Sequence, residues 1–396
     1  MPDYDVIVIG AGLTGVATAY HLAKGGASVL VIEQQQINRG ASGANAGSLH
    51  FQLEHRLIEH LGDLNDELSF YAALARMAIT DWRELETELQ ENIELEMTGG
   101  LMLAETPQQM SKLELKAKIE SEQGLDVTLL DKASVLDKAP YLSDSITGAL
   151  FCADEGHCNP RLLTHAFARK ASILGTKLQM QTEVKALKRN GDMWSVTAQT
   201  TGTEKTTYTA KALVNAAGAW SAAVARMANL HLPLFPVGLT ISVTEKVPAI
   251  MNQMIQHVGH KLSLKQVDDG NLLIGGGWAA KLPQRHGKWK KNYKAVLDIN
   301  ALRQNLAIAC KVMPQIADLH VLRSWTGTTG ITPDQLPIIG GIDQAPGFYV
   351  AAGGSGFTYG PTYAKLLAEL ILTEKTSFPI GAYSPNRFGH MNMFMG

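Results

Sequence analysis

The stretch Asp5-Val-Ile-Val-Ile-Gly-Ala-Gly-Leu-Thr-Gly15 decides the fold. Its apolar run predicts a short buried strand, which breaks into three glycines and leads into a helix from Leu13 to Lys24. Gly10 permits the tight turn, Gly12 lets the backbone approach a pyrophosphate, and Gly15 lets the helix lie close to the sheet. The helix N-terminus also offers unpaired N–H groups and a partial positive charge to an anion.

A second predicted strand, Ala27 to Ile32, is followed by an acidic residue. Glu33 lies 18 residues after Gly15, where a βαβ unit places the carboxylate that binds the ribose hydroxyls of adenosine. Glycines alone are a weak signal, but strand, glycines, helix, strand and acid together predict a dinucleotide-binding unit. From this unit alone the cofactor could be NAD or FAD.

Three later runs of small residues distinguish between NAD and FAD as the cofactor. The runs are Arg39–His50, Ala212–Trp220 and Gly353–Pro361. An NAD-binding fold would usually continue with another simple βα unit, whereas glycine and alanine runs let the backbone press against an extended ligand. The third run also opens a helix, with Pro361 in its first turn, so a positive helix end would face the ligand. Three separated loops of this kind favour FAD.

Length, charge and cysteine content limit the class of protein. A chain of 396 residues is long enough for two domains. With 35 basic and 37 acidic residues, no global field would draw it onto nucleic acid or a membrane. No apolar run approaches the roughly 20 residues that a membrane span requires. The three cysteines form neither a disulfide framework nor a metal-binding pattern. We therefore expect a cytoplasmic protein, with membrane association through a partner left open.

Six blocks of the chain resemble a known family. Besides the N-terminal glycines they are Gly40–Gly47, His157–Arg161, Val214–Trp220, Thr332–Gly340 and Ala351–Gly356. With these blocks the chain resembles the flavoprotein superfamily of D-amino-acid oxidase, glycine oxidase and sarcosine oxidase. The segment 262–275 is more similar to the β subunits of heteromeric proline, hydroxyproline and opine dehydrogenases.

The resemblance implies an α/β fold in two parts. One is a discontinuous, Rossmann-like FAD-binding domain, and the other is an α+β substrate domain whose mixed or antiparallel sheet lies over the flavin. Alternating apolar residues between Leu234 and Trp278 support such a sheet. The expected ranges are 1–85, 146–222 and 325–396 for the FAD-binding domain, and 86–145 and 223–324 for the substrate domain.

The resemblance also implies noncovalent FAD and a set of residues that bind it. Val184 is expected to contact the adenine through its backbone. The predicted cofactor-binding residues are Gly10, Gly12, Leu13, Thr14, Gly15, Glu33, Gln34, Ala41, Ser42, Ala46, Gly47, Val184, Ala217, Gly218, Trp220, Gly327, Gly330, Gly354, Gly356, Phe357 and Thr358.

The implied reaction is oxidation of the C–N bond of a small amino or imino acid, such as proline, hydroxyproline, an opine, a D-amino acid or N-methylglycine. The flavin accepts a hydride at N5, and the imine product is hydrolysed. The lysine that the oxidases place over the flavin corresponds to Leu273. We therefore favour a dehydrogenase subunit that passes electrons to a partner subunit or acceptor, with an oxygen-using oxidase, a flavin electron carrier and an RNA-modifying oxidase as alternatives.

The segment Arg323–Asp334 is bare of the reactive side chains that the relatives carry. Their carboxylate-binding arginine corresponds to Thr329, and their flavin-linked cysteine corresponds to Gly327. A covalent link through this segment is therefore excluded. We expect the segment to be a turn at the flavin edge, where Gly327 and Gly330 let the backbone approach the ring.

The predicted catalytic residues are His50, Gln266 and Thr329. His50 follows the small-residue run, although an ordinary core or surface histidine fits equally well. Alternation places Lys265 and Gln266 on opposite faces of a strand that should cover the flavin, and the resemblance favours Gln266 as the pocket residue. Arg56 is a further candidate for the carboxylate anchor, with a solvated arginine as the alternative.

Two remaining features are interpreted as unrelated to catalysis. His257 and His260 have no carboxylate or cysteine at ligand spacing, so we predict no metal site. The segment Arg285–Lys294 has five basic residues and no acid, which indicates a solvated loop, with a subunit contact or RNA binding as alternatives. The expected partners are thus a small amino or imino acid and other subunits or an electron acceptor, and not nucleic acid.

Overall fold

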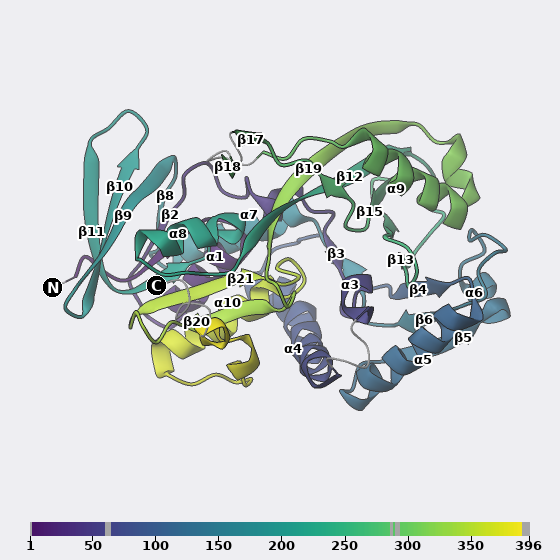
Figure 1. The fold of residues 1–396 in the computed structure, drawn as a ribbon, viewed down its shortest axis with the longest axis horizontal. Coiled ribbons are helices and arrows are strands. Elements are labelled where there is room, and N and C mark those ends of the chain that lie inside the picture. Colours follow the sequence, from purple (N-terminus) through teal and green to yellow (C-terminus); the bar gives the residue numbers. More distant parts are fainter. Residues whose placement is uncertain (1, 60–64, 286–287, 290–293, 390–396) are drawn as a thin grey trace.

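The computed structural model describes residues 2–59, 65–285, 288–289 and 294–389. Two large sheets lie beside one another along the long axis of the molecule (Figure 1). The sheet that contains the N-terminal strand is on the left of this view, and the second sheet is on the right. The α/β class with two parts that the sequence predicts is therefore confirmed.

The first sheet is built on β1 (Tyr4–Ile9), whose last four residues are buried, as in the centre of a parallel sheet. The strand order is β20-β21-β11-β1-β2-β8, and β9 and β10 continue from β11 as antiparallel strands. β1 runs parallel to both β2 and β11. The other strands are β2 (Val29–Ile32), β8 (Lys177–Gln179), β9 (Thr182–Asn190), β10 (Met193–Thr200), β11 (Lys205–Asn215), β20 (Pro337–Gly341) and β21 (Phe348–Gly353).

Helices pack against this sheet through small residues. Helix α1 (Leu13–Lys24) contacts α7 (Pro160–Ile173) and α10 (Gly360–Thr373). A Cβ atom at Gly15 would lie 2.0 Å from the carbonyl oxygen of Gly10, so α1 can leave the strand at this angle only with glycine there. The predicted helix from Leu13 to Lys24 is confirmed with the same bounds, and a helix does follow the run Gly353–Pro361.

The second sheet is mixed, because β13 runs parallel to β4 while its other pairs are antiparallel. The order is β16-β12-β15-β14-β13-β4-β6-β5, and β19 pairs with β12. The strands are β4 (Gly100–Ala104), β5 (Val127–Asp131), β6 (Gly148–Cys152), β12 (Phe235–Lys246), β13 (Met254–His257), β14 (Ser263–Gln266), β15 (Asn271–Gly275), β16 (Ala279–Ala280) and β19 (Val321–Ile331).

One helix joins the two halves. Helix α4 (Asn65–Leu89) contacts α10 of the first half and α5 (Pro107–Glu122) of the second. Helix α6 (Lys132–Lys138) lies against β5 and β6, and α9 (Ile299–Val312) lies against β15. The short elements are α2 (Ala41–Ala44), β3 (Ser48–Leu49), α3 (His55–Ile58), β7 (Gly156–His157), α8 (Ser221–Met227), β17 (Gln284–Arg285), β18 (Lys288–Trp289) and the 3-10 turns η1 (Gly218–Trp220), η2 (Pro314–Asp318), η3 (Gly381–Tyr383) and η4 (Pro385–Phe388).

Strand pairing changes two details of the sequence prediction. Strand β6, placed in the FAD-binding range 146–222, pairs with β4 and β5 of the second sheet. The predicted turn at Arg323–Asp334 is a strand as far as Ile331, because β12 supplies ladder partners for it from Phe235 to Thr244. The chain turns only after Ile331, where Thr332 Oγ1 donates a 2.6 Å hydrogen bond to the carbonyl oxygen of Leu336. Residues 325–331 therefore extend the second sheet.

Candidate active site

A cavity of about 770 Å³ lies between the two sheets. The turns after β1, β2, β11 and β21 line one part of it, together with α2. Strands β12, β13, β14, β15 and β19 line the other part. The cavity therefore joins a dinucleotide-type cradle to a chamber on the second sheet.

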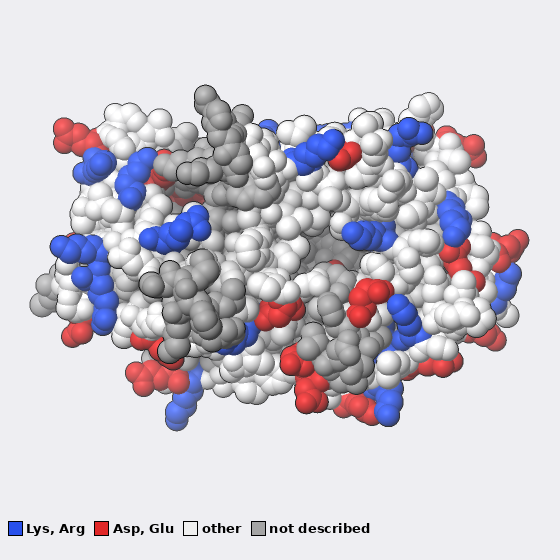
Figure 2. Space-filling view, in the orientation of Figure 1, with Lys and Arg blue, Asp and Glu red and all other residues white. Residues whose placement is uncertain are grey.

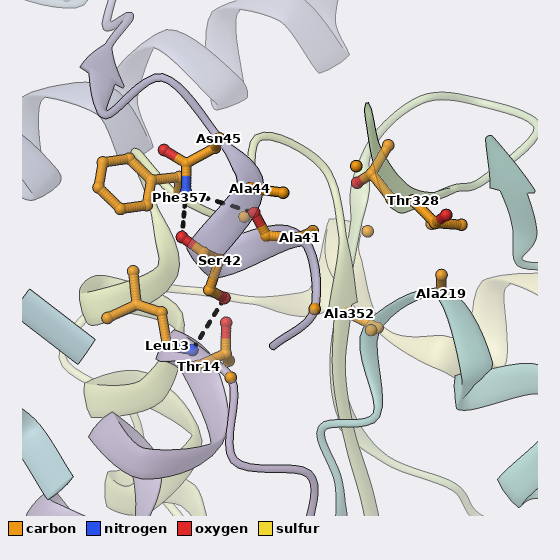
Figure 3. A pocket seen from close by; sticks show the side chains of 18 of the residues that line it. Leu13, Thr14, Ala41, Ser42, Ala44, Asn45, Ala219, Thr328, Ala352 and Phe357 are labelled. Carbon is orange, nitrogen blue, oxygen red and sulfur yellow. Dashed lines mark hydrogen bonds between the residues drawn. The ribbon is translucent and has the colours of Figure 1, made fainter. Parts of the chain in front are cut away.

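The cradle begins where β1 meets α1. Gly10 has φ +108°, and a Cβ atom there would lie 2.5 Å from the carbonyl oxygen of Ala216, so a larger residue would meet both strain and a clash. Helix α1 begins after Gly12, whose position has no side-chain cap. Its N–H groups are therefore available to an anion, apart from that of Leu13, which donates a 2.9 Å hydrogen bond to Ser42 Oγ (Figure 3).

Glu33 reaches the same turn from the end of β2. Its Oε2 accepts a 2.9 Å hydrogen bond from the Ala11 N–H, and its Oε1 accepts one of 2.7 Å from the Gln35 N–H. The carboxylate is thereby held at the wall of the cavity. This is the place at which a ribose hydroxyl pair would meet it in a βαβ unit.

The helix α2 positions the cradle against the second sheet. Asn45 Nδ2 donates to the carbonyl oxygen of Ser42, and Trp325 Nε1 of β19 donates a 2.8 Å hydrogen bond to the carbonyl oxygen of Ala44. A Cβ atom at Gly327 would lie 2.9 Å from Ala44 Cβ, so a bulky residue at that position would push the two apart. In Figure 3, Thr328 lies across open space from Ser42.

A second helix N-terminus faces the cavity from the first sheet. Helix α10 starts after Tyr359 with Pro361 in its first turn and no side-chain cap, so its first N–H groups are not taken by a capping side chain. The loop before it is held by Trp82 Nε1, which donates a 2.6 Å hydrogen bond to the carbonyl oxygen of Thr358. Thr358 Oγ1 accepts a hydrogen bond from the His50 N–H.

These features fit FAD. Glycine turns and two helix N-termini suit a pyrophosphate and the electron-rich edge of a flavin, and Glu33 suits a ribose. Residues 5–370 match the family described as FAD dependent oxidoreductase. The chain belongs to this family. Its cofactor is FAD, as the sequence predicts.

Several known proteins are similar to this oxidoreductase. It is 26% identical to an opine oxidase subunit from Rhizobium meliloti over 98% of each chain, and 29% identical to glycine oxidase of Geobacillus kaustophilus over 97% of each. The crystal structure of L-proline dehydrogenase from P. horikoshii superposes with a TM-score of 0.86 at 26% identity, over 99% of each chain. The matched region spans only 45% of rat mitochondrial dimethylglycine dehydrogenase, a further relative at 25% identity that covers 97% of this chain.

Most predicted cofactor residues of this FAD dependent oxidoreductase line the cavity. Gly15 and Gly47 do not. Gly15 serves helix packing, and Gly47, with φ +77°, lies against the carbonyl oxygen of Cys158, so both residues shape the cradle from behind. The predicted residues that line the cavity are Gly10, Gly12, Leu13, Thr14, Glu33, Gln34, Ala41, Ser42, Ala46, Val184, Ala217, Gly218, Trp220, Gly327, Gly330, Gly354, Gly356, Phe357 and Thr358.

Of the three predicted catalytic residues, His50 and Thr329 line the cavity. His50 Nε2 lies 3.1 Å from Ser263 Oγ, and its Nδ1 is buried with no hydrogen-bond partner among the described residues. Burial lowers the pKa of His50; the charge of Glu54 opposes this shift, and the charge of Lys265 adds a smaller lowering. The imidazole is thus held in its neutral form.

The prediction that Gln266 lines the pocket is wrong. Its Oε1 accepts hydrogen bonds from the N–H groups of Ile250 and Met251. Its Nε2 donates hydrogen bonds to the carbonyl oxygens of Val247, Pro248 and Gly270. The side chain points away from the cavity and holds the chain segment before β13. Alternation places Lys265 on the other face of β14, but neither residue lines the cavity.

Lys265 is two residues from Ser263 on β14, so it shares the face of the strand that carries Ser263, but it is 2% exposed and does not line the cavity. Burial lowers its pKa to about 7, although Cys158, Asp268 and Glu96 each oppose the shift. Its charge contributes to the lowered pKa of His50.

The polar lining residues that the sequence reasoning missed include Gln256 on β13, Ser263 on β14 and Lys261 before it. Among the described residues that line the cavity, the lysine and arginine side chains are those of Lys261 and Arg39. Arg39 belongs to the cradle. Lys261 is therefore a positive group on the substrate side. A single polar residue in a strand gives no sequence pattern that would show whether its side chain lines a cavity. The side chain of Arg56 and most of the basic segment 285–294 lie outside the described residues.

Two carboxylate–histidine clusters lie outside the cavity. One brings Glu105 to His257 and His260, although no acid stands near these histidines in the sequence. His257 Nδ1 accepts the Gly259 N–H, so its hydrogen is on Nε2, which faces Glu105 and offers no lone pair to a metal. The other cluster joins Glu96, His157 and Asp268. The sequence prediction of no metal site stays a prediction.

Charges on the outer surface are mixed. In Figure 2, Lys and Arg side chains alternate with Asp and Glu side chains across the face shown, between wide areas without charge. No helix among the described residues is both long enough and apolar enough to cross a membrane.

Proposed function

We propose that this FAD dependent oxidoreductase oxidises the C–N bond of a small amino or imino acid. The observation that carries the proposal is the continuity of the cavity: the cradle for FAD opens directly onto a chamber lined by His50, Ser263, Gln256 and Lys261. Bound FAD would supply the hydride acceptor. The chain itself supplies polar groups for a substrate that carries both a carboxylate and an amine.

Lys261 is the proposed partner of the substrate carboxylate. It takes the place of the arginine that the sequence lacks at Thr329, and it lies where the cavity meets solvent. Its side chain is exposed, so the interaction would be screened by salt and modest in strength. Thr329 lines the same chamber and offers a hydroxyl in place of a charge.

His50 is the proposed group beside the reacting carbon. Its neutral imidazole is bound by Ser263 on one side and has an unpartnered Nδ1 on the other. A neutral group in a buried chamber favours a neutral substrate amine. In this form the carbon that bears the amine can give up a hydride. The apolar residues Val237, Leu239 and Ile241 exclude water from the same chamber.

The relatives support a substrate of this size and the use of a partner. Their names refer to opines, glycine, dimethylglycine and L-proline, and one is a subunit of a larger enzyme. We propose noncovalent FAD and a dehydrogenase that passes electrons to a partner protein. An oxygen-using oxidase is the second candidate, which the match to glycine oxidase supports.

Anaerobic reduction of the flavin tests the activity. Purified protein with FAD would be mixed with D- and L-amino acids, L-proline, hydroxyproline, N-methylglycine and opines, while the loss of flavin absorbance is recorded. Reduction by at least one of these compounds is expected. If none reduces the flavin, the proposal is wrong.

The acceptor and the flavin linkage need separate measurements. Turnover with an artificial dye but not with oxygen would support the dehydrogenase, and hydrogen peroxide formation would support the oxidase. Acid precipitation should release all the FAD into the supernatant, and retention of FAD in the pellet would disprove a noncovalent cofactor.

A further inference from the structure

A buried carboxylate lies directly behind one polar residue of the chamber wall. Glu155 is completely buried and follows β6. Its Oε1 accepts hydrogen bonds of 3.1 Å from the Gln52 N–H and 3.2 Å from Gln256 Nε2. Its Oε2 accepts one of 3.0 Å from Gln52 Nε2 and lies 3.5 Å from Gln256 Nε2. All its partners are donors, as an ionised carboxylate requires.

The orientation of the Gln52 amide is determined independently. Its Oε1 accepts a 2.8 Å hydrogen bond from the ammonium group of Lys116, which can only donate. Its Nε2 must therefore face Glu155, and it also reaches the carbonyl oxygen of Gly100. Lys116 itself is buried and paired with Glu120. This network gives Gln52 one orientation.

Gln256 is the member of the network that reaches the cavity. Within the described part of the chain its recorded hydrogen bonds run from Nε2 to Glu155, while the residue also lines the cavity. Gln256 stands opposite Ser263 on β14, and Ser263 stands opposite Gly275 on β15. Cross-strand partners share a face, so these three residues form one row along the chamber. With Nε2 held by the carboxylate, Oε1 is the atom left for the cavity.

We propose that Glu155 holds the amide of Gln256 so that its Oε1 faces the chamber and accepts a hydrogen bond from an N–H of the substrate amine. The inference rests on the proposed function, because it names the group that recognises the amine. Gln256 would contact the substrate, and Glu155 would act as a positioning residue through it.

A consequence follows for the class of substrate. A neutral primary or secondary amine has an N–H to donate, whereas a neutral tertiary amine has none. An acceptor in the chamber therefore favours primary and secondary amines over N,N-dialkyl amines. It also favours an N–H heterocycle over the same ring with oxygen in place of nitrogen.

Protonation of Glu155 would remove this preference. Burial raises the pKa of Glu155 to about 7, with Glu120 acting in the same direction and Gln52 and Lys116 opposing it. Cys152 is a further titratable group near it. A protonated Glu155 would need an acceptor, and Gln52 Oε1 is already bound by Lys116. Among the side chains bonded to Glu155, the remaining acceptor is Gln256 Oε1, so the amide would turn and present Nε2 to the chamber.

Two unreactive ligands of almost equal shape test the proposal. Pyrrole-2-carboxylate has a ring N–H, and furan-2-carboxylate has a ring oxygen that only accepts. Their dissociation constants would be measured on the holoenzyme by the change in flavin absorbance and by calorimetry, between pH 6 and 9. At pH 8 the pyrrole is expected to bind about tenfold more tightly, the effect of one hydrogen bond. The ratio should fall towards one below pH 7.

Three variants assign the effect to these residues. Gln256→Met should abolish the preference at every pH. Glu155→Gln should give a smaller preference with no dependence on pH, because an amide can satisfy either orientation of Gln256. Gln253→Met, on the same segment but bonded to Tyr141 instead, is the control and should keep the wild-type ratio and its pH dependence.

Each result supports or overturns the proposal. Equal binding of the two ligands by the wild-type enzyme at pH 8, or a preference that survives Gln256→Met, would overturn it. An unchanged pH dependence in Glu155→Gln would overturn the role of Glu155. If that variant fails to fold, the wild-type pH dependence and Gln256→Met still decide. Failure of the proposed function looks different, since then no amine would reduce the flavin and neither ligand would bind.

Discussion

The indole Nε1 of Trp325 donates a 2.8 Å hydrogen bond to the carbonyl oxygen of Ala44. Trp325 belongs to the second sheet and Ala44 to the small-residue helix of the cradle, so this bond joins the two parts that must close around FAD. Phenylalanine at position 325 would keep most of the packing and lose the bond.

We therefore expect Trp325→Phe to weaken FAD binding about fivefold, corresponding to about 1 kcal/mol. Titration of the apoprotein with FAD, followed by flavin fluorescence, measures this. Trp194→Phe is the control, since it removes a similar bond to the carbonyl oxygen of Pro346 away from the cavity. Equal FAD affinity in wild type and Trp325→Phe would contradict the role of the bond.

Gly10→Ala should destabilise the fold and abolish FAD binding. Its Cβ atom would meet the carbonyl oxygen of Ala216 at 2.5 Å, in addition to the strain of φ +108°. Gly26→Ala is the matched control, because φ is +90° there and nothing lies within 4 Å of the added Cβ atom. The difference between their unfolding free energies, about 1–3 kcal/mol, isolates the clash. Denaturation of both variants without added FAD measures it, and equal values would show that the turn can adjust.

Gly275→Ala should affect substrate and leave the fold intact. The added Cβ atom would meet Ile241 Cγ1 at 3.7 Å, an ordinary contact, and would project into the chamber. We expect KM to rise about tenfold for any amino acid that is oxidised. Gly341→Ala, on a strand away from the cavity with contacts of 3.4 Å and longer, controls for a glycine replacement in a strand. An unchanged KM would place the substrate elsewhere.

Lys261→Met should raise KM about threefold to fivefold at low salt, with little change in kcat, because an exposed ion pair contributes weakly to binding. The difference from wild type should shrink as salt is added. Lys281→Met removes another exposed lysine, paired with Asp298, and should leave KM unchanged. Steady-state kinetics at two ionic strengths decide the matter. A loss confined to kcat would argue against a carboxylate partner.

Lys265→Met should change the dependence of stability on pH. Burial lowers the folded-state pKa of Lys265 from 10.5 to about 7. Between these pH values the unfolded chain binds one proton more, so this lysine makes the unfolding free energy rise with pH. Methionine should therefore stabilise the protein most at pH 6, with the advantage shrinking towards pH 10. Denaturation of the holoprotein across this range measures it, and Lys211→Met, at an exposed ion pair with Asp5, should show no such trend.

Local patterns explain how much of the fold was predictable. The apolar run of β1, the glycines after it and Glu33 interact with neighbours that are close in sequence, so their spacing alone indicates the cradle. The start of α10 is equally local, since Pro361 lies in its first turn. Alternation likewise showed that Lys265 and Gln266 face opposite ways, but it could not show which face is the cavity.

The errors share one physical cause. Gln266 was misplaced because its partners come from residues 247–251 and from Gly270, which only the turn around β14 brings to its amide. The segment Arg323–Ile331 was predicted to be a turn but is a strand. It is a strand because it pairs with β12, which is remote in sequence.

The sequence by itself determined the nucleotide cradle, the family and FAD, because each depends on short segments whose backbone geometry glycine and proline restrict. Only the tertiary structure decided what stands in the chamber. His50, Gln256 and Ser263 come from three separate segments, and their meeting depends on strand register, which a one-residue shift would reverse. The carboxylate of Glu155 behind them is invisible in the sequence because its hydrogen bonds exist only once those strands have paired.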